Sequence, residues 1–166
     1  MTTTIGSLIT SQVIQLLTGS SGVNSYLAAS TQDNGQAMVP LSALQVRAQN
    51  VSAEIADQSN TMQYPAVNVY CEKIVNSLIE KFRSLSGNVQ TTIELRFSQD
   101  RLDGLQDVLE NYTDGIIQVL NANRGDWGNG MFYTGAYQVL FGAVKHGGKN
   151  FLQVAKIVFE IGVSRS

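Results

Sequence analysis

The first part of the chain, residues 1–18, carries apolar side chains at helical spacing and no charged residue. The apolar positions are Ile5, Leu8, Ile9, Val13, Leu16 and Leu17. This period predicts an amphipathic helix that Thr3 or Thr4 caps at its start and that Gly19 ends. The apolar side of such a neutral helix needs a cover, which is either its own domain or a neighbouring subunit.

The next stretch has a weaker periodic pattern. Residues 20–39 are rich in small polar side chains and predict a loop with one short helical turn at 23–28. Residues 44–56 predict a second helix, because apolar residues return at helical spacing. The inward positions of that helix are Leu44, Val51 and Ile55.

Alternation of apolar and polar residues then predicts two strands. The first is 64–71, with Pro65 near its start, where a missing backbone donor is tolerated. The clearest is 89–97, and residues 74–85 between them fit either a helical turn or a connection. The predicted buried face of the second strand is Val89, Thr91, Ile93, Leu95 and Phe97. Its predicted solvent-facing side is Gln90, Thr92, Glu94 and Arg96.

The clearest helix follows directly, with Asp100 as its predicted N-cap and an end near Asn121. Its predicted core stripe is Leu102, Leu105, Leu109, Tyr112, Ile116 and Leu120. Four acidic residues lie within about 60° of one another on the other side. These residues, called the acidic ridge, are Asp103, Asp107, Glu110 and Asp114. With no Lys or Arg along this stretch, the ridge is either a solvated face or a surface for a basic partner.

Two long apolar and aromatic runs, 131–144 and 151–163, make up the last third of the chain. Between them, the turn segment 145–150 contains two adjacent glycines, which supply the positive φ of a tight hairpin. Each run exceeds the usual strand length of about 5–6 residues, so we expect the hairpin to project or to line a shared surface. The element order predicts an α+β fold, with a mainly antiparallel sheet, a long C-terminal hairpin, one long helix packed on it and an N-terminal helix.

Length and composition refine this picture. The 166 residues suit an α+β domain at 41–166 preceded by an N-terminal helical extension and loop at 1–40. Only 14% of the residues are charged and the net charge is −2, which argues against a strongly basic nucleic-acid binder. The lone Cys71 forms no internal disulfide and is expected as a small buried residue. Without a signal-peptide pattern or a long apolar run, we expect a soluble protein made in a reducing cytoplasm.

The residues that common catalysis needs are scarce. The one histidine, His146, lies in a glycine-rich turn, and the one thiol, Cys71, lies in a distant strand, so no Cys–His pair is expected. The sequence has no Cys/His cluster that would predict a zinc site. The acidic ridge lacks the convergent partners of a Mg²⁺ or Ca²⁺ site. Residues 142–150 depart from a phosphate-binding loop, because they hold an extra glycine and Asn150 replaces the Ser/Thr. The sequence therefore predicts no enzyme, no metal and no cofactor.

A mixed patch at 124–133 joins the long helix to the last third of the chain. It holds three glycines, the only tryptophan, Trp127, and Arg124 near the helix C-terminus, where a positive charge is favourable. The patch is either a turn whose Trp127 covers the end of the core or an interface, because Trp and Arg are enriched at binding hot spots.

Several of these segments resemble a group of bacteriophage virion proteins. They are YPAVNVYCE at 64–72, EKFRSLSG at 80–87, SQDR at 98–101, NRGDW at 123–127 and KHGGKNFLQ at 145–153. The resemblance covers roughly residues 44–164. The element order is similar to that of the tail-terminator (neck) fold, a small α+β unit that forms hexameric rings.

The resemblance implies a structural protein of the virion neck, made in the cytoplasm of the host bacterium. Such a ring caps the tail tube, ends tail assembly and docks to the head-completion or connector proteins. DNA passes through its centre without specific binding, which a net charge of −2 per subunit suits. Two other functions stay open: a head-completion or connector-adaptor protein of the same neck, and a nucleic-acid-binding module. The last would use Arg124, Trp127, Lys145 and Lys149.

Because a ring is built from heterologous contacts, two different surfaces of the chain must be complementary. We expect the acidic ridge to be one of them. The other, called the basic tip, is Lys145, His146 and Lys149. Arg124 and Trp127 are further candidates for the subunit or tail-tube interface. Contacts between subunits are also expected to complete the burial of the N-terminal helix and of the long hairpin.

Overall fold

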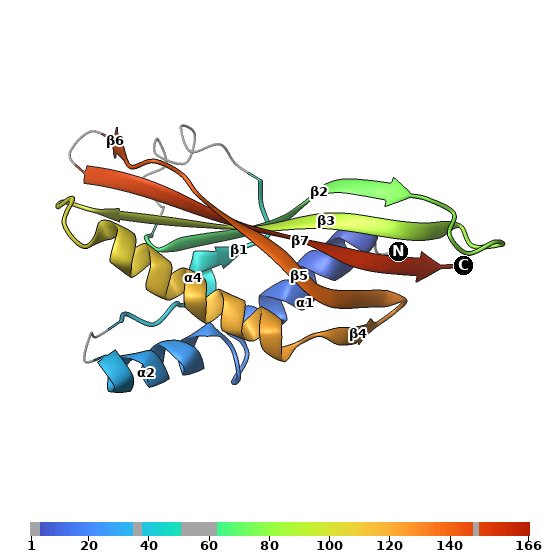
Figure 1. Ribbon diagram of the computed structural model, residues 1–166, viewed down its shortest axis with the longest axis horizontal. Coiled ribbons are helices and arrows are strands. Elements are labelled where there is room, and N and C mark those ends of the chain that lie inside the picture. The colour runs from blue at the N-terminus through green and yellow to red at the C-terminus, as the bar shows by residue number, and fades with distance from the viewer. Residues whose placement is uncertain (1–3, 35–37, 51–62, 148–149) are drawn as a thin grey trace.

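A computed structural model of the chain describes residues 4–34, 38–50, 63–147 and 150–166. The fold is α+β, as the sequence predicts, and a curled mixed sheet lies against a layer of helices (Figure 1). The helices are α1 (Ile5–Thr18), α2 (Val23–Asn34) and α4 (Leu105–Ala122), with a 3₁₀ turn η1 (Ala43–Gln45). The strands are β1 (Val46–Arg47), β2 (Ala66–Asn76), β3 (Leu85–Gln99), β4 (Gly125–Gly128), β5 (Met131–Phe141), β6 (Lys145–Gly147) and β7 (Asn150–Arg165).

The strand order of the sheet is β1-β2-β3-β7-β5-β4, with β6 paired to β7. Among the described strands, β1 and β2 run parallel and every other pair is antiparallel. At the centre, β3 and β7 pair without interruption from Leu85↔Arg165 to Gln99↔Phe151. The predicted strand at 89–97 is therefore confirmed and extends at both ends, and the predicted strand at 64–71 is confirmed as part of β2.

The face of β3 that was predicted to be buried does lie against the helices. Val89, Thr91, Ile93 and Leu95 are fully buried and Phe97 is half-buried. Their register partners on β7 complete the same layer, since Ile93 pairs with Ile157 and Leu95 with Ala155, both fully buried. These residues form one core with the buried sides of α1 and α4.

The opposite face of β3 does not form the solvent-facing side that alternation predicts. Thr92 is fully buried, and Glu94 and Arg96 are only 5% and 1% exposed. Arg96 Nη2 lies 2.8 Å from Glu94 Oε1, and the Tyr70 hydroxyl donates to Glu94 Oε2 at 3.0 Å. The prediction is wrong because two opposite charges that share a strand face can pair with each other and be buried together. Gln90 alone of the four keeps partial exposure.

Helix α1 matches its prediction in extent. Thr4 caps its start by accepting a hydrogen bond from the Ser7 amide at 3.3 Å, and Gly19 ends it. Its buried residues are Ile5, Ile9, Val13 and Leu17. They pack on β2, β3 and α4 of the same chain, so the buried side of α1 is covered by its own domain. Leu8 and Leu16 are only half-buried, and the expectation that contacts between subunits complete the burial of this helix stays a prediction.

Helix α2 corrects the prediction of a loop with one short turn. It is 12 residues long and packs against α4. A Cβ at Gly115 of α4 would lie 3.2 Å from Val23 Cγ1, so the glycine permits close approach of the two helices. Because Val23 and Leu27 are the only large aliphatic residues of α2, its period is weak, and tertiary packing stabilises a helix that pattern alone does not reveal.

The helix predicted over 44–56 is wrong in the part that the structure describes. Residues 43–45 form the 3₁₀ turn η1, and the extended backbone that follows pairs with β2 through Val46↔Val67. Leu44, predicted to face inward, is 71% exposed. The Gln45 side chain accepts a hydrogen bond from the Ser42 amide at 2.7 Å, which closes the turn locally. Val51 and Ile55 lie outside the described residues.

Helix α4 begins later than predicted. Its N-cap is Gly104, with φ 79°, instead of Asp100. The Gln99 side chain donates to the carbonyls of Arg101 and Asp103 at 2.6 and 2.9 Å, which holds the preceding residues in a turn. Leu102 is consequently exposed and does not belong to the core stripe. The remaining predicted core residues, Leu105, Leu109, Tyr112, Ile116 and Leu120, are all buried.

Candidate functional site

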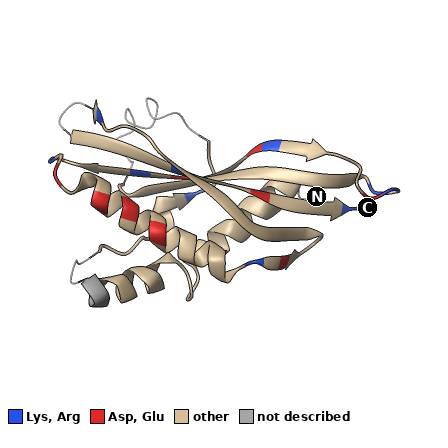
Figure 2. Ribbon diagram, in the orientation of Figure 1, with Lys and Arg blue, Asp and Glu red and all other residues tan. Residues whose placement is uncertain are grey.

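The acidic ridge is shorter than the sequence predicts. Asp103 lies before α4, in the turn, and three exposed residues of the ridge remain on the helix: Asp107, Glu110 and Asp114. Figure 2 shows them as a row along α4 with no basic residue beside them on the helix. Within the part of the chain that is described, none of the three forms an ion pair, and Glu110 accepts a hydrogen bond from the Gln106 side chain at 2.8 Å. The ridge presents uncompensated negative charge.

The basic tip lies on β6. Lys145 and His146 are exposed, and the His146 ring packs edge-on against Phe151 with 5.2 Å between ring centroids. Lys149 lies outside the described residues. Figure 1 shows β3 and β7 between β6 and α4, so the structure does not bring the basic tip and the acidic ridge together within one chain.

Arg124 and Trp127 lie where α4 leads into β4. The Trp127 side chain is half-buried, donates from Nε1 to the Asn123 carbonyl at 2.7 Å, and packs on Tyr133 with 5.6 Å between ring centroids. This position suits a residue that covers the end of the core. Arg124 is exposed and lies against β5 at Gly135. A Cβ added to Gly135 would lie only 2.8 Å from Arg124 Cδ. An interface role for the two stays a prediction.

A surface that the sequence did not reveal is the connection between β2 and β3, residues 77–84. Three large apolar side chains of this connection are exposed: Leu78, Ile79 and Phe82. Ile79 is 71% exposed and Phe82 is wholly exposed. We call residues 77–84 the apolar loop. Its sequence signal is that these residues lie among the charged Glu80, Lys81 and Arg83 in a segment with no clear period.

Hydrogen bonds hold the apolar loop in one conformation. Asn76 Oδ1 accepts from the amides of Ser86 and Leu78 at 3.0 and 3.3 Å. The Glu80 carboxylate accepts from the Ser164 hydroxyl at 2.7 Å and lies 3.2 Å from Arg83 Nε. The Ser164 hydrogen bond is the main cause that lowers the pKa of Glu80 below its ordinary value. The loop is therefore anchored to both β3 and β7.

The backbone of the apolar loop also adopts an unusual conformation. Leu78 and Phe82 have φ values of 48° and 65°, in the left-handed region that bulky side chains rarely occupy. Strained positions of this kind persist where surrounding contacts hold them, and they often mark functional segments. Here the surrounding contacts hold two apolar side chains in solvent instead of burying them.

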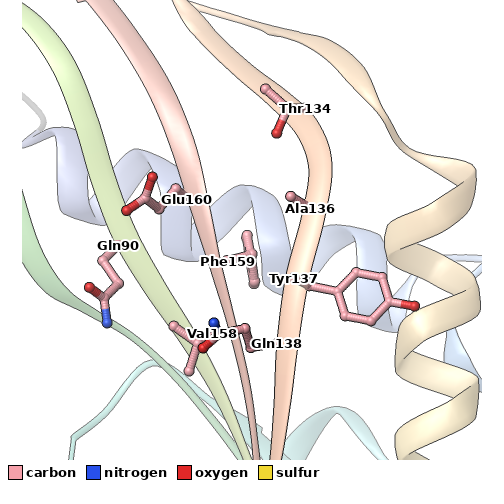
Figure 3. A pocket seen from close by; sticks show the side chains of 8 residues that line it. All are labelled: Gln90, Thr134, Ala136, Tyr137, Gln138, Val158, Phe159 and Glu160. Atoms are coloured by element: carbon pink, nitrogen blue, oxygen red, sulfur yellow. The ribbon is translucent and has the colours of Figure 1, made fainter.

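A hollow of about 530 Å³ lies on the face of the sheet that turns away from the helices (Figure 3). It is lined by Gln90, Thr134, Ala136, Tyr137, Gln138, Val158, Phe159 and Glu160. A β-bulge in β5 explains the hollow. Between two paired positions β5 advances by four residues, from Tyr133 to Tyr137, while β7 advances by only two. Gly135, with φ 100°, allows the bend. We call this depression the outer hollow.

Groups that could bind a metal ion are not brought together in the described parts of the chain. There, no three His, Cys, Asp or Glu side chains are arranged to hold a metal ion. Cys71 is half-buried with its Sγ 3.7 Å from the Gly6 carbonyl, and burial raises the pKa of its thiol. A raised pKa keeps a thiol protonated and therefore a poor nucleophile.

The fold and these surfaces are the basis on which function must be argued. Comparison with protein-family models and with curated proteins found no match. Among the described helices, none is both long enough and apolar enough to span a membrane. The described chain has exposed apolar side chains on the apolar loop and on β5. It also has two charged surfaces, the acidic ridge and the basic tip. Exposed apolar patches are features of surfaces that bind other proteins.

Proposed function

We propose that this chain is a non-enzymatic structural subunit that assembles into a homo-oligomeric ring, a hexamer in the neck of a phage virion. The observation that carries the proposal is exposed apolar surface in two separate regions of one chain. One region is the apolar loop. The other is β5, where Phe132 is exposed near the start of the strand and Leu140 and Phe141 are exposed at its end. Soluble monomers rarely expose large contiguous apolar patches unless these bind something.

Two separate regions suit a ring better than a two-fold dimer. A ring uses a heterologous contact, in which one surface of each subunit meets a different surface of the next, whereas a two-fold dimer can use one patch twice. The long strands support the same reading. β5 and β7 have 11 and 16 residues, longer than the usual 5–6, and so extend the surface that the sheet offers to neighbours.

Charge complementarity gives this ring a second contact. We propose that the acidic ridge of one subunit faces the basic tip of the next, because the two have opposite charge and are separated within a chain. Reversing Asp107 and Asp114 to Lys is expected to shift the mass seen by light scattering from the ring toward the single chain. Asp126→Lys, an exposed reversal on β4, is the control and is expected to leave the ring intact. An unchanged ring mass in the double variant contradicts the pairing.

The place in the neck rests on the resemblance of the segments at 64–72, 80–87, 98–101, 123–127 and 145–153 to phage virion proteins, together with the α+β fold. The proposed ring caps the tail tube, ends tail assembly and docks to the head-completion proteins, while DNA passes through the centre. The net charge of −2 per subunit supports a channel that does not hold DNA tightly, since phosphate affinity grows with each Lys or Arg contact.

Binding to purified phage parts tests this placement. We expect the protein to co-sediment with tail tubes that lack heads and not with DNA-filled heads that lack tails. The reverse result favours a head-completion or connector-adaptor protein of the same neck. Binding to neither part, by protein that does form rings, contradicts a place in the neck and leaves ring formation standing.

A further inference from the structure

We infer that the apolar loop of one copy inserts into the outer hollow of a second copy, with Ile79 and Phe82 as the inserted side chains. This inference rests on the proposed self-association and names its apolar contact. The two surfaces are distinct parts of one chain, as a heterologous contact requires.

The apolar loop has the properties of a preformed binding element. Its side chains at Ile79 and Phe82 point into solvent, while the hydrogen bonds of Asn76, Glu80 and Ser164 fix the backbone beneath them. A loop fixed in its bound conformation loses little entropy on association, which favours tight binding. An aromatic anchor that enters a pocket is the usual centre of a protein interface.

The outer hollow has the shape and lining for such an anchor. Its volume of about 530 Å³ lies within the roughly 300–1,000 Å³ of typical ligand pockets. Ala136 and Val158 contribute apolar lining, and Gln90, Gln138 and Glu160 contribute polar groups (Figure 3). The Phe159 side chain itself belongs to the core on the other face of the sheet. A mixed lining of this kind matches an apolar side chain carried on a loop with charged neighbours.

The charges of the two surfaces are also complementary. The apolar loop carries Lys81, which makes no ion pair within the described residues, next to the paired Glu80 and Arg83. The hollow carries Glu160, and Glu72 lies at its edge, where it accepts a hydrogen bond from Gln90 at 2.8 Å. Lys73, the register partner of Gln90, and Lys156, which precedes Val158 by two residues on the same face of β7, balance these two charges overall. Glu160 itself makes no ion pair within the described residues and is the charge that Lys81 of a second copy would meet. A second copy therefore supplies both the apolar side chains and the positive charge that the hollow accepts.

The first test removes the anchor. The double variant Ile79→Ser/Phe82→Ser is expected to run at the mass of a single chain at concentrations where the wild type is fully assembled. Leu44→Ser is the matched control, because Leu44 is 71% exposed, as Ile79 is, but lies outside both surfaces. The control is expected to assemble like the wild type. Circular dichroism of each variant verifies that its fold is retained.

A second test gives a positive signal. Copies carrying Lys81→Cys are mixed with copies carrying Glu160→Cys, both with Cys71→Ala, and oxidised, so that Ile79 and Phe82 stay in place. A disulfide-linked pair is expected only in the mixture. The charge pair is checked by Lys81→Glu and Glu160→Lys, each of which weakens assembly alone, whereas the combined variant recovers it.

The outcomes separate this inference from the proposed function. If the wild type assembles, the double serine variant assembles equally well and no cross-link forms, the loop-to-hollow contact is wrong and the ring stands. If the wild type stays a single chain at every concentration, both are wrong.

Discussion

At the scale of single residues, the fold is distinguished by polar groups inside the protein. Tyr112 and Tyr133 are both buried, yet their hydroxyls differ. The Tyr112 hydroxyl donates to the Val39 carbonyl at 2.6 Å, whereas the Tyr133 hydroxyl has no hydrogen-bond partner within the described residues. Burial accordingly raises the pKa of Tyr133 to about 12.

This difference predicts opposite results for the same substitution. Tyr112→Phe removes a hydrogen bond and strands a carbonyl, so we expect the free energy of unfolding to fall by about 0.5–1.5 kcal/mol. Tyr133→Phe removes only an unpaired hydroxyl, so the free energy is expected to stay the same or rise. Urea unfolding of the two variants measures both values. Equal losses would show that the Tyr133 hydroxyl has a partner.

The buried pair of Glu94 and Arg96 leads to a second prediction. Arg96→Met leaves the Glu94 carboxylate buried without its counter-charge, so we expect a loss of about 3–5 kcal/mol in the free energy of unfolding. Arg101→Met is the control, because Arg101 lies 3.9 Å from Asp100 in an exposed pair, whose contribution is about 0–1 kcal/mol. Comparable losses in the two variants would contradict the buried pairing.

At the scale of elements, the packing of α2 on α4 depends on one glycine. Gly115→Val places new methyl groups where a Cβ alone would already lie 3.2 Å from Val23, so we expect a loss of about 1–3 kcal/mol. Gln118→Val introduces the same side chain at an exposed site of the same helix and is expected to change stability by about 0.5 kcal/mol or less. Thermal unfolding of both variants gives the comparison. If Gly115→Val is as stable as Gln118→Val, the close packing is not as described.

Elements with a strong period were predictable from sequence, and elements stabilised by their surroundings were not. The period of α1 and the alternation in β3 identified the type of each element and the face that packs on the core, but alternation missed the burial of the other face of β3. α2 was missed because its burial depends on Gly115, far along the chain. The start of α4 was misplaced because Asp100 has the side chain of a typical N-cap, whereas the observed N-cap is Gly104, which has a positive φ.

The candidate surfaces were predictable only in part, for a related reason. Charges repeated along a helix are visible in sequence, so most of the acidic ridge was found. The outer hollow was not, because it arises from a register shift between β5 and β7. The apolar loop was not found either, because exposure of Leu78 and Phe82 contradicts the rule that large apolar residues are buried.

At the scale of the whole molecule, one chain buries its core without help and leaves two apolar surfaces and two charged surfaces exposed. The buried side of α1 packs on its own domain, whereas Leu8 and Leu16 stay half-buried. What assembly would cover is the apolar loop, the outer hollow and the side of β5 beside it. We therefore propose a subunit with its own core, whose exposed surfaces join it to further copies.

The most direct test of this account is particle imaging of the purified wild-type protein by electron microscopy. The account predicts closed rings with six-fold rotational symmetry and a central opening, in which each repeat corresponds to one 18.0 kDa chain. Closed rings with another rotational symmetry would support the proposed ring but contradict the proposed number of six subunits. Single particles of one chain, or two-fold dimers at every concentration, would contradict the central claim.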